Sequence, residues 1–272
     1  MDHYYCVING RVLKVRQEGQ TVYASLFPET DSAGILHVLS DVFRFDDDAD
    51  QIFAEISADA HIAGAVAMHR GLRLMRQDPW ECLISYLCSI NSNIPRIRGD
   101  VERISRSYGE RIVFDDTVFH TFPGPAVLAN ADESELRKLR LGFRAAYIAA
   151  AARKVRDERI DLHSLRRAPY GEALEVLLSF HGVGPKVADC VLLFSMDKLE
   201  AFPVDRWVKR GVEILYFGGR NLPERKVREW ARGHFGRYAG YAQEYLFYGS
   251  RLREIAASAG ASLSKPSLPE LK

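Results

Sequence analysis

Apolar and polar residues alternate along residues 4–27 (YYCVINGRVLKVRQEGQTVYASLF), as they do in strands that bury one face. The pairs Asn9-Gly10 and Glu18-Gly19 interrupt the alternation, and Asn-Gly between alternating runs is a strong hairpin signal. From about residue 50 onward, the apolar spacing becomes that of amphipathic helices. The pattern therefore predicts a mainly α chain with a small N-terminal antiparallel β layer, of the α+β class.

Prolines stand where many of the expected helices begin, a position that tolerates a fixed φ and a missing N–H donor. The spacing predicts helices over 48–57, 62–69, 79–91, 93–107, 117–121, 125–130, 132–138, 143–156, 161–165, 169–179, 184–195, 206–214, 223–234 and 238–252. We expect a β-rich layer over 1–50, a helical domain over 51–255 and a frayed Ser/Pro-rich tail over 256–272.

The composition is that of a folded, water-soluble protein, with 47% hydrophobic and 27% charged residues among 272. No window approaches the length of an uncharged membrane span, and the first residues, MDHYYCV, do not resemble a secretory leader. The four cysteines are scattered, which argues against a disulfide scaffold, a zinc knuckle or an all-cysteine iron–sulfur cluster. We expect a cytoplasmic protein without a membrane partner.

The net charge of +1 by itself says nothing for nucleic acid. The basic residues, however, are 28 Arg and 9 Lys, and arginine is the better bidentate ligand for phosphate. This bias is only weak evidence for anion recognition, because genomic base composition or a thermophilic surface would also produce it.

The segment 177–205 (LLSFHGVGPKVADCVLLFSMDKLEAFPVD) combines a glycine-rich turn with two charged residues in unusual places. Gly182-Val183-Gly184 separates two helices and leaves backbone N–H groups open at the start of the second, where a phosphate can bind. Lys186 lies in the first turn, where the helix dipole disfavours a cation, and Asp205 would cap the next helix. Taken singly, these features are also those of a plain helical hairpin, a solvated lysine and a simple cap.

Together, the turn, Lys186 and the Pro-Val-Asp ending at Asp205 resemble the helix–hairpin–helix (HhH-GPD) DNA glycosylase superfamily. The form Gly-Val-Gly-x-Lys-Val-Ala-Asp-Cys is similar to its 8-oxoguanine DNA glycosylase branch, and the resemblance extends over about residues 75–255. It implies the helix–hairpin–helix glycosylase fold, with the hairpin at about 177–195. It also implies that Lys186 attacks the sugar C1′ and that Asp205 assists. A lysine at this position marks the bifunctional type, which also cleaves the DNA backbone.

The residue types suit this chemistry. Breaking an N-glycosidic bond builds oxocarbenium character at C1′, which a fixed carboxylate stabilises. An amine can displace the base and form a Schiff base, after which loss of a C2′ proton eliminates the 3′-phosphate. No metal or other cofactor is needed.

Two further segments resemble the parts of the family that read the base left behind by the extruded nucleotide. The first, 89-SINSNIPRIRGDVERI, contains Asn91, Asn93 and Arg96, and the second, 139-LRLGFRAAYIAAAARKV, contains Phe143 and Arg144. The resemblance implies that Asn91 fills the gap, Phe143 wedges beside the orphan base, and the two arginines bond the acceptor edge of a cytosine. An Asn-rich loop before a helix and an ordinary core phenylalanine are the alternatives.

The fourth segment, 238-YAGYAQEYLFYGSRL, resembles the helix of the family that lines the pocket for the extruded base. It implies that Gln243 bonds the Watson–Crick edge of that base and that Phe247 and Cys190 enclose its faces, with Phe194 completing the pocket. Aromatic residues at helical spacing are more often core. The expected partner is double-stranded DNA with a damaged base or abasic site, bound by a monomer, in a nucleoid-associated prokaryotic setting.

The chain departs from the family at three points. The family's Gly-Gln-x-Phe-x-Trp stretch, whose glycine carbonyl recognises 8-oxoguanine, has no counterpart near Met1, so either the gene start is misplaced or another acceptor is used. Trp207 stands where eukaryotic members have histidine, and the iron–sulfur cysteines of the endonuclease III and adenine glycosylase branches are missing. The expected activity is bifunctional excision of 8-oxoguanine opposite cytosine. An alkylpurine or other-lesion glycosylase and a non-catalytic DNA-binding module remain the alternatives.

Overall fold

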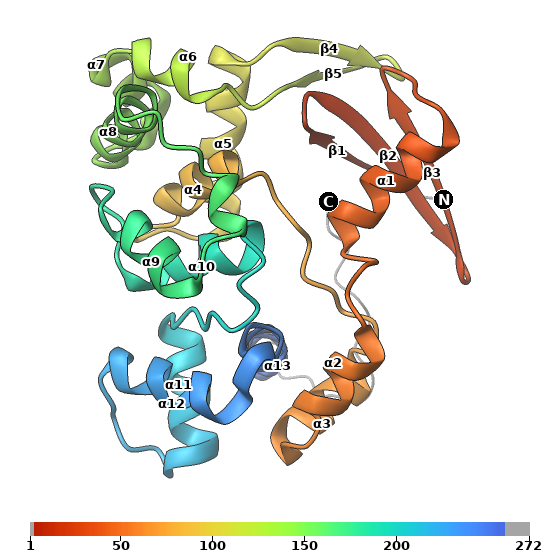
Figure 1. Ribbon diagram of the computed structural model, residues 1–272, viewed down its shortest axis with the longest axis vertical. Helices are drawn as coiled ribbons and strands as arrows, with labels where there is room; N and C mark the ends of the chain where they lie inside the picture. The colour runs from red at the N-terminus through yellow and green to blue at the C-terminus, as the bar shows by residue number, and fades with distance from the viewer. Residues whose placement is uncertain (1–2, 259–272) are drawn as a thin grey trace. The chain divides into compact units, whose positions relative to one another are not determined.

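The N-terminal strands form as the alternation predicts. In the computed structural model, which describes the backbone of residues 3–258 and side chains as far as residue 249, they make one antiparallel sheet. Its strands, in the order β1-β2-β3, are β1 (Tyr4–Ile8), β2 (Arg11–Glu18) and β3 (Thr21–Phe27). Leu13 pairs with Leu26 across the sheet, and both are buried against Leu39 of a covering helix. One face of the sheet is therefore the core of this layer (Figure 1).

That covering helix, α1 (Ser32–Phe43), lies within the expected β-rich layer over 1–50 and corrects the expectation that helical spacing begins only at about residue 50. Asp31 caps it by accepting a hydrogen bond from the Gly34 N–H at 2.8 Å. The sequence does carry the signal, since an Asx cap precedes apolar residues at helical spacing.

The chain divides into two compact units that the sequence does not separate. The first contains residues 1–47 and 74–198, and the second contains residues 48–73 and 199 onward. The expected 51–255 domain therefore contributes to both units. The predicted tail lies outside the described residues beyond Ser258.

The first unit continues the N-terminal layer with helices that surround α4. Its remaining elements are α4 (Pro79–Cys88), α5 (Ile94–Tyr108), β4 (Arg111–Phe114), β5 (Thr117–His120), α6 (Pro125–Asn130), α7 (Glu133–Leu136), a π-helical turn (Arg137–Leu141), α8 (Arg144–Asp157), a 3-10 turn (Ser164–Arg166), α9 (Tyr170–Leu178) and α10 (Pro185–Ser195). Helix α4 packs against α5, α8 and α10, and its Leu83, Ile84 and Leu87 are fully buried. It is the central helix of this unit.

The hairpin formed by β4 and β5 overturns the predicted helix at 117–121. Its turn residues Asp115 and Asp116 both have positive φ, 50° and 55°, as two-residue hairpin turns of this kind require. The hairpin extends from α5 to the N-terminal sheet, where Tyr5 stacks on Phe119 and donates a hydrogen bond to Asp115 at 3.0 Å (Figure 1). The helix prediction was wrong because the four residues of β5 are too few to show whether the apolar spacing is that of a helix or of a strand.

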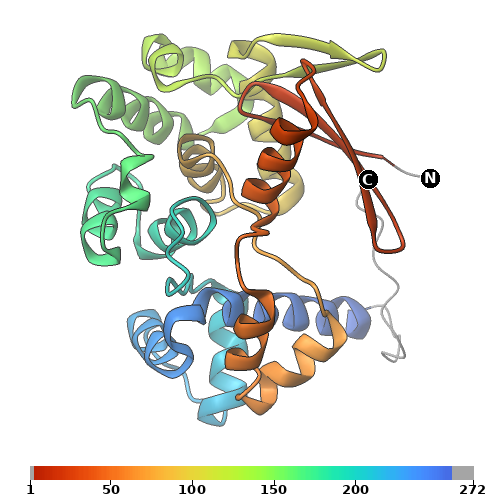
Figure 2. The same ribbon diagram turned by 45° about the vertical axis from the view of Figure 1, so that its right-hand side comes forward.

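The second unit is entirely helical in its described part. It contains α2 (Ala49–Ile56), α3 (Ala60–Met68), α11 (Arg206–Phe217), α12 (Glu224–Phe235), a 3-10 turn (Gly236–Tyr238) and α13 (Ala239–Ser258). Helix α13 packs against each of the other α-helices, with Tyr241, Ala242 and Tyr245 buried (Figure 2). The predicted class, mainly α with a small N-terminal antiparallel sheet, is confirmed.

Candidate functional site

The turn between α9 and α10 contains two glycines, and each has a different structural role. Gly182 has φ 88°, and a Cβ added there would lie 2.6 Å from Cγ of Tyr147. Gly184 has φ −96°, and an added Cβ would meet nothing within 4 Å. Gly182 is therefore needed by the fold, whereas Gly184 leaves open space in front of the helix.

The N-terminus of α10 is not capped by a side chain. Gly184 occupies the cap position, Pro185 follows, and among the described residues no side chain bonds the first amides of the helix. Val183 between the glycines is buried and donates its N–H to the Phe180 carbonyl at 3.0 Å, which fixes the turn. Free amides at the positive end of a helix form a site for an anion such as a phosphate.

Lys186, in the first turn of α10, is half-buried and lies over an aromatic ring. Its Nζ is 5.0 Å from the ring centroid of Tyr86, which in turn stacks on Phe194 at 5.9 Å. The same nitrogen donates to Oγ of Ser89 at 3.4 Å, and the Ser89 hydroxyl donates to the Tyr86 carbonyl at 2.6 Å. Within the described part of its own unit, no carboxylate forms an ion pair with Lys186. The amine is therefore held by neutral groups and not by a counter-charge.

Asp205 caps α11 with one carboxylate oxygen. Oδ1 accepts from the backbone N–H groups of Trp207 at 2.9 Å and Val208 at 2.8 Å. Oδ2 accepts no hydrogen bond from any described residue of this unit, and the side chain is partly exposed. The cap fixes the direction of the carboxylate and leaves its second oxygen available to a ligand.

Glu244 on α13 is a second acidic group in the field of Asp205. Burial, and then the negative charge of Asp205, raise the pKa of Glu244 to about 7. A further negative charge beside Asp205 is thus partly suppressed at neutral pH. Glu244 was not predicted as a site residue, because nothing in its sequence spacing distinguishes it from a surface carboxylate.

The residues expected to line the base pocket come from both units. Gln243 and Phe247 lie on α13 in the second unit, and Cys190 and Phe194 lie on α10 in the first. Gln243 is 5% exposed, and its Oε1 accepts no hydrogen bond from the described residues. A buried amide oxygen without a donor is costly unless a ligand supplies one.

The loop after α4 and the loop before α8 are joined by Arg144. This side chain is 3% exposed, and it donates from Nε to the Ile90 carbonyl at 2.8 Å and from Nη2 to the Asn91 carbonyl at 2.8 Å. Asn91 has φ 48°, in the left-handed region that asparagine adopts more readily than most residues other than glycine. The exposed Asn91 side chain is thus presented on a left-handed turn that the buried arginine stabilises.

Arg96 connects the same two segments in the opposite direction, from the start of α5 to the π-helical turn before α8. Asn93 caps α5 by accepting the Arg96 N–H at 3.0 Å, and the Arg96 guanidinium reaches the Arg140 carbonyl at 3.5 Å. Arg140 also has positive φ, 64°. Phe143, 43% exposed, lies directly after this π-helical turn with the Arg144 guanidinium 4.7 Å from its ring. The structure therefore joins the loop that carries Asn91, Asn93 and Arg96 to the segment that carries Phe143 and Arg144.

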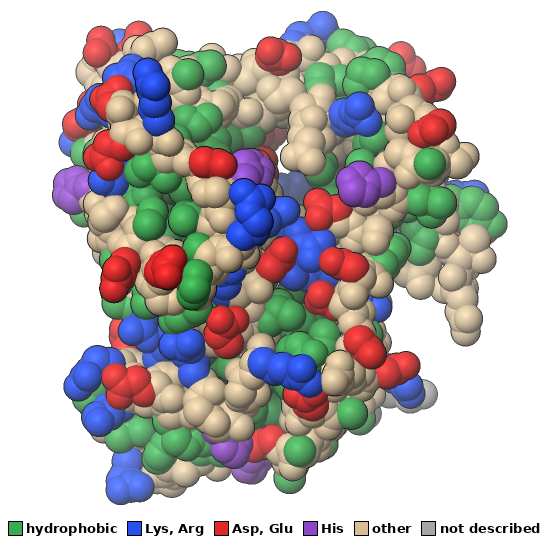
Figure 3. All heavy atoms as spheres, viewed as in Figure 1, with side chains coloured by type: hydrophobic (Ala, Val, Ile, Leu, Met, Phe, Trp, Pro, Cys, Tyr) green, Lys and Arg blue, Asp and Glu red, His purple; other side chains and the backbone are tan. Residues whose placement is uncertain are grey.

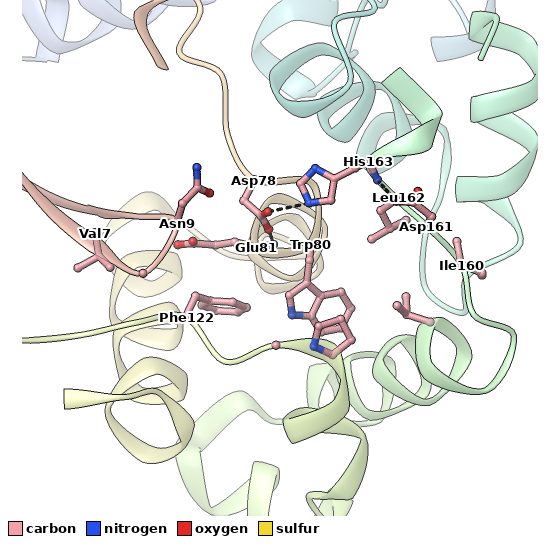
Figure 4. A pocket seen from close by; sticks show the side chains of 14 residues that line it. Val7, Asn9, Asp78, Trp80, Glu81, Phe122, Ile160, Asp161, Leu162 and His163 are labelled. Atoms are coloured by element: carbon pink, nitrogen blue, oxygen red, sulfur yellow. Dashed lines mark hydrogen bonds and ion pairs between the residues drawn. The ribbon is translucent and has the colours of Figure 1, made fainter. Parts of the chain in front are cut away.

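A cavity of about 350 Å³ lies at the opposite end of α4 from the Asn91 loop. It is lined by Asp78, Trp80, Glu81, Phe122 and His163, among others, and by none of the predicted site residues. Asp78 pairs with His163 at 3.3 Å, while the Glu81 carboxyl extends toward Asn9 (Figure 4). Burial and the Asp78 charge raise the pKa of Glu81 to about 7.

Basic and acidic side chains are interspersed over the face shown in Figure 3, in keeping with the net charge of +1. Within the described residues, no group of three or more His, Cys, Asp or Glu side chains could hold a metal ion. No helix of that part of the chain is long and apolar enough to cross a membrane.

The fold and the hairpin define a helix–hairpin–helix protein of DNA base excision repair. The family model described as the HhH-GPD superfamily base excision DNA repair protein matches residues 84–234. The model of the 8-oxoguanine DNA glycosylase N-terminal domain matches residues 1–83. The chain belongs to the HhH-GPD superfamily, in its 8-oxoguanine DNA glycosylase branch.

Two curated relatives carry the names of enzymes. The probable N-glycosylase/DNA lyase of Methanothermobacter thermautotrophicus is 37% identical over 213 residues, which are 71% of this chain and 68% of that protein. The N-glycosylase/DNA lyase OGG1 of Arabidopsis thaliana is 40% identical over 197 residues, 68% of this chain. The match spans about half of the plant protein, 53% of its length.

Solved structures show the same fold over nearly the whole chain. MBOgg1, in complex with a low-affinity DNA ligand, has a TM-score of 0.88 and 36% identity, over 93% of this chain and 86% of that one. The Clostridium acetobutylicum 8-oxoguanine glycosylase/lyase, bound to DNA with cytosine opposite 8-oxoguanine, has a TM-score of 0.87 and 32% identity, over the same shares. The 3-methyladenine DNA glycosylase of Archaeoglobus fulgidus, 22% identical over 92% of this chain and 87% of its own, shares the fold with a TM-score of 0.77.

Proposed function

We propose that this chain is a bifunctional DNA glycosylase and abasic-site lyase that removes 8-oxoguanine opposite cytosine from double-stranded DNA, acting as a monomer. The observation that carries the proposal is the position of Lys186. It lies in the first turn of α10, behind uncapped amides, with its amine against Tyr86 and Ser89 and no carboxylate partner in the described part of its own unit. A structural lysine would be expected to reach solvent or a counter-charge.

In the proposed reaction, the unprotonated Nζ of Lys186 attacks C1′ of the extruded nucleotide. The new C1′–N bond replaces the bond from C1′ to the base, and the base leaves with the electron pair and takes up a proton. The sugar ring opens to a protonated Schiff base. A base then removes a C2′ proton, and the electrons expel the 3′-phosphate. Water releases the lysine from the cleaved product.

Asp205 supports the first step electrostatically. As the base departs, positive charge grows on C1′ and the ring oxygen, and a carboxylate fixed beside them stabilises this charge. The two amides that hold Oδ1 fix the carboxylate before substrate binds, so little reorganisation is required. Partial protonation of Glu244 weakens the second negative charge beside Asp205.

The uncapped amides of α10 would hold a phosphate of the damaged strand. Gln243 would bond the Watson–Crick edge of the extruded base, which would satisfy its unpartnered Oε1, while Cys190, Phe194 and Phe247 would enclose the faces. Asn91 and Phe143 would occupy the gap. Arg96 and Arg144 would bond the O2 and N3 acceptors of the orphan cytosine, with Arg144 exchanging one of its backbone carbonyls for the base.

Discrimination between 8-oxoguanine and guanine requires an acceptor for the added N7–H, because an unmet buried donor costs about 1–3 kcal/mol. We place this acceptor on a backbone carbonyl near the C-terminal helix or the 1–12 segment.

The proposal is tested with labelled duplexes that contain one lesion each, incubated with the protein and borohydride. Excision of 8-oxoguanine opposite cytosine with a trapped covalent adduct is the expected result. Preferred excision of 3-methyladenine or hypoxanthine would instead identify an alkylpurine enzyme. Binding without excision or adduct on every duplex would leave a non-catalytic DNA-binding module.

A further inference from the structure

Asp100 is a fully buried carboxylate that none of the proposed chemistry uses. It lies on α5 with 0% exposure. Its Oδ1 accepts a hydrogen bond from the Arg103 guanidinium. Its Oδ2 accepts none from the described residues, and Nε of Arg96 lies 4.0 Å from it. Two arginines therefore balance one buried charge from the same helix face, at i−4 and i+3.

Both arginines lead from Asp100 to the π-helical turn before α8. Arg103 donates from Nε to the Leu139 carbonyl at 2.7 Å, and Arg96 donates from Nη2 to the Arg140 carbonyl at 3.5 Å. These two consecutive carbonyls belong to the turn in which Arg140 has positive φ. Asp100 is thus the anchor of two donors that hold the backbone leading to Phe143.

The environment of Cys88 shows how these charges converge. Burial and then the charge of Asp100 raise the pKa of this α4 thiol, against the opposing charges of Arg144 and Arg103, to about 12. The carboxylate thus acts on the same part of α4 as Arg144, the arginine that holds the Asn91 turn.

Stability alone does not account for Asp100. Replacing a buried ion pair by apolar residues of similar size is often neutral or stabilising, because desolvation offsets most of the attraction. The Arg96 side chain is 52% exposed, with Nε beside Asp100 and Nη2 on the Arg140 carbonyl, so the guanidinium is oriented at two points and stays accessible to a ligand. This is the arrangement of a side chain that is pre-oriented for a ligand.

We propose that Asp100 is a positioning residue that holds Arg96 in the orientation that reads the base opposite the lesion, and so sets the preference for cytosine. This inference rests on the proposed function, in which Arg96 contacts that base. Asp100 sets this preference through Arg96 and contacts no substrate atom.

The test compares single-turnover excision of 8-oxoguanine opposite cytosine and opposite adenine. In Asp100→Asn, an isosteric change, the cytosine-to-adenine ratio should fall about tenfold, within the range that one base-edge contact contributes. In an Arg96→Ala background, the same change should leave the ratio unaltered. Glu102→Gln is the matched control, since Glu102 lies on α5 in an exposed pair with Arg106, and its ratio should equal that of the wild type.

A second readout, binding to duplexes with a tetrahydrofuran abasic analogue opposite each base, does not require chemistry. If Asp100→Asn folds poorly, the neutral pair Asp100→Asn with Arg103→Gln removes the anchor without leaving the Arg103 guanidinium unpaired. Unchanged discrimination in the folded variant, or an equal loss on every duplex, overturns the inference for Asp100.

A wild-type protein that excises 8-oxoguanine but ignores the opposite base overturns the role of Arg96 and this inference with it. Absence of excision overturns the proposed function, while base-dependent binding lost in Asp100→Asn would still support the anchor.

Discussion

Arg144 donates a hydrogen bond from Nη2 to the backbone carbonyl of Asn91 at 2.8 Å, across 53 residues of sequence. An arginine expected to read a base thus also stabilises the left-handed turn that presents a neighbouring site residue. Arg96 makes the reciprocal connection to Arg140. Each loop depends on a guanidinium that the other loop supplies.

Arg144→Ala should lower the free energy of unfolding by about 2–3 kcal/mol, because it removes the charged hydrogen bonds from a buried guanidinium to the Ile90 and Asn91 carbonyls. Arg96→Ala, at a half-exposed side chain, should change it by less than about 1 kcal/mol. Both should reduce the preference for cytosine opposite the lesion. Urea unfolding of the two variants, followed by excision assays on four opposite bases, checks this difference. Equal stability of the two would show that the carbonyl bonds of Arg144 contribute nothing.

Lys186→Gln should abolish both the borohydride-trapped adduct and strand cleavage, since an amide nitrogen cannot form a Schiff base. Binding to a duplex with an abasic analogue should persist. Gel analysis of trapped complexes measures the first effect and a binding titration the second. An undiminished adduct would mean that another amine is the nucleophile.

Asp205→Asn should slow base excision at least about 100-fold, the effect of losing about 3 kcal/mol of transition-state stabilisation. The melting temperature should change little, because the asparagine oxygen can still accept from the Trp207 and Val208 amides. Single-turnover kinetics and thermal unfolding together separate the two roles. A parallel loss of activity and stability would reduce Asp205 to a helix cap.

The two glycines of the hairpin turn should respond in opposite ways to alanine. Gly182→Ala should destabilise the protein by more than about 1 kcal/mol, because a Cβ would clash with Tyr147 at a positive φ. Gly184→Ala should leave stability unchanged or slightly raised, yet weaken DNA binding, because its Cβ would occupy the space before the uncapped amides. Each variant is the control for the other. Unaltered DNA affinity in Gly184→Ala would argue that no phosphate binds there.

Glu81 should make the protein less stable as the pH rises. Its pKa of about 7 in the folded protein lies above the ordinary 4.5, so the folded state binds more protons between these values. The associated stability is complete below about pH 4.5 and is lost as the pH rises through 7. Relative to wild type, Glu81→Gln should therefore gain up to about 3 kcal/mol between pH 5 and pH 8.

Urea unfolding at both pH values measures the gain from Glu81→Gln, and Glu102→Gln, at an exposed carboxylate, should show none. The raised pKa of Glu244 affects the pH dependence of stability equally in wild type and in both variants, so its contribution cancels in the comparison. The same curve for Glu81→Gln and wild type would mean that the carboxylate is hydrated in the cavity.

Local signals were sufficient for most elements and for the hairpin. The start of α10 follows from a glycine turn and a proline, so the position of Lys186 could be derived without tertiary information. The same holds for Asp205, whose cap bonds are to residues two and three positions ahead. At β5, where the segment has only four residues, the helix prediction was wrong, and α1 was not predicted because its N-terminal cap was overlooked.

The tertiary structure alone decided which distant residues meet. The π-helical turn before Phe143, the burial of Asp100, and the bonds from Arg96 and Arg144 depend on α5 and α8 bringing two loops together. The proximity of Glu244 to Asp205 likewise depends on the packing of α13 against α11. Hydrophobic periodicity specifies which face of each helix is buried, but packing between helices specifies which polar groups share the low-dielectric interior. The sequence therefore determined the chemistry this chain can carry, and the packed structure determined the groups that orient it.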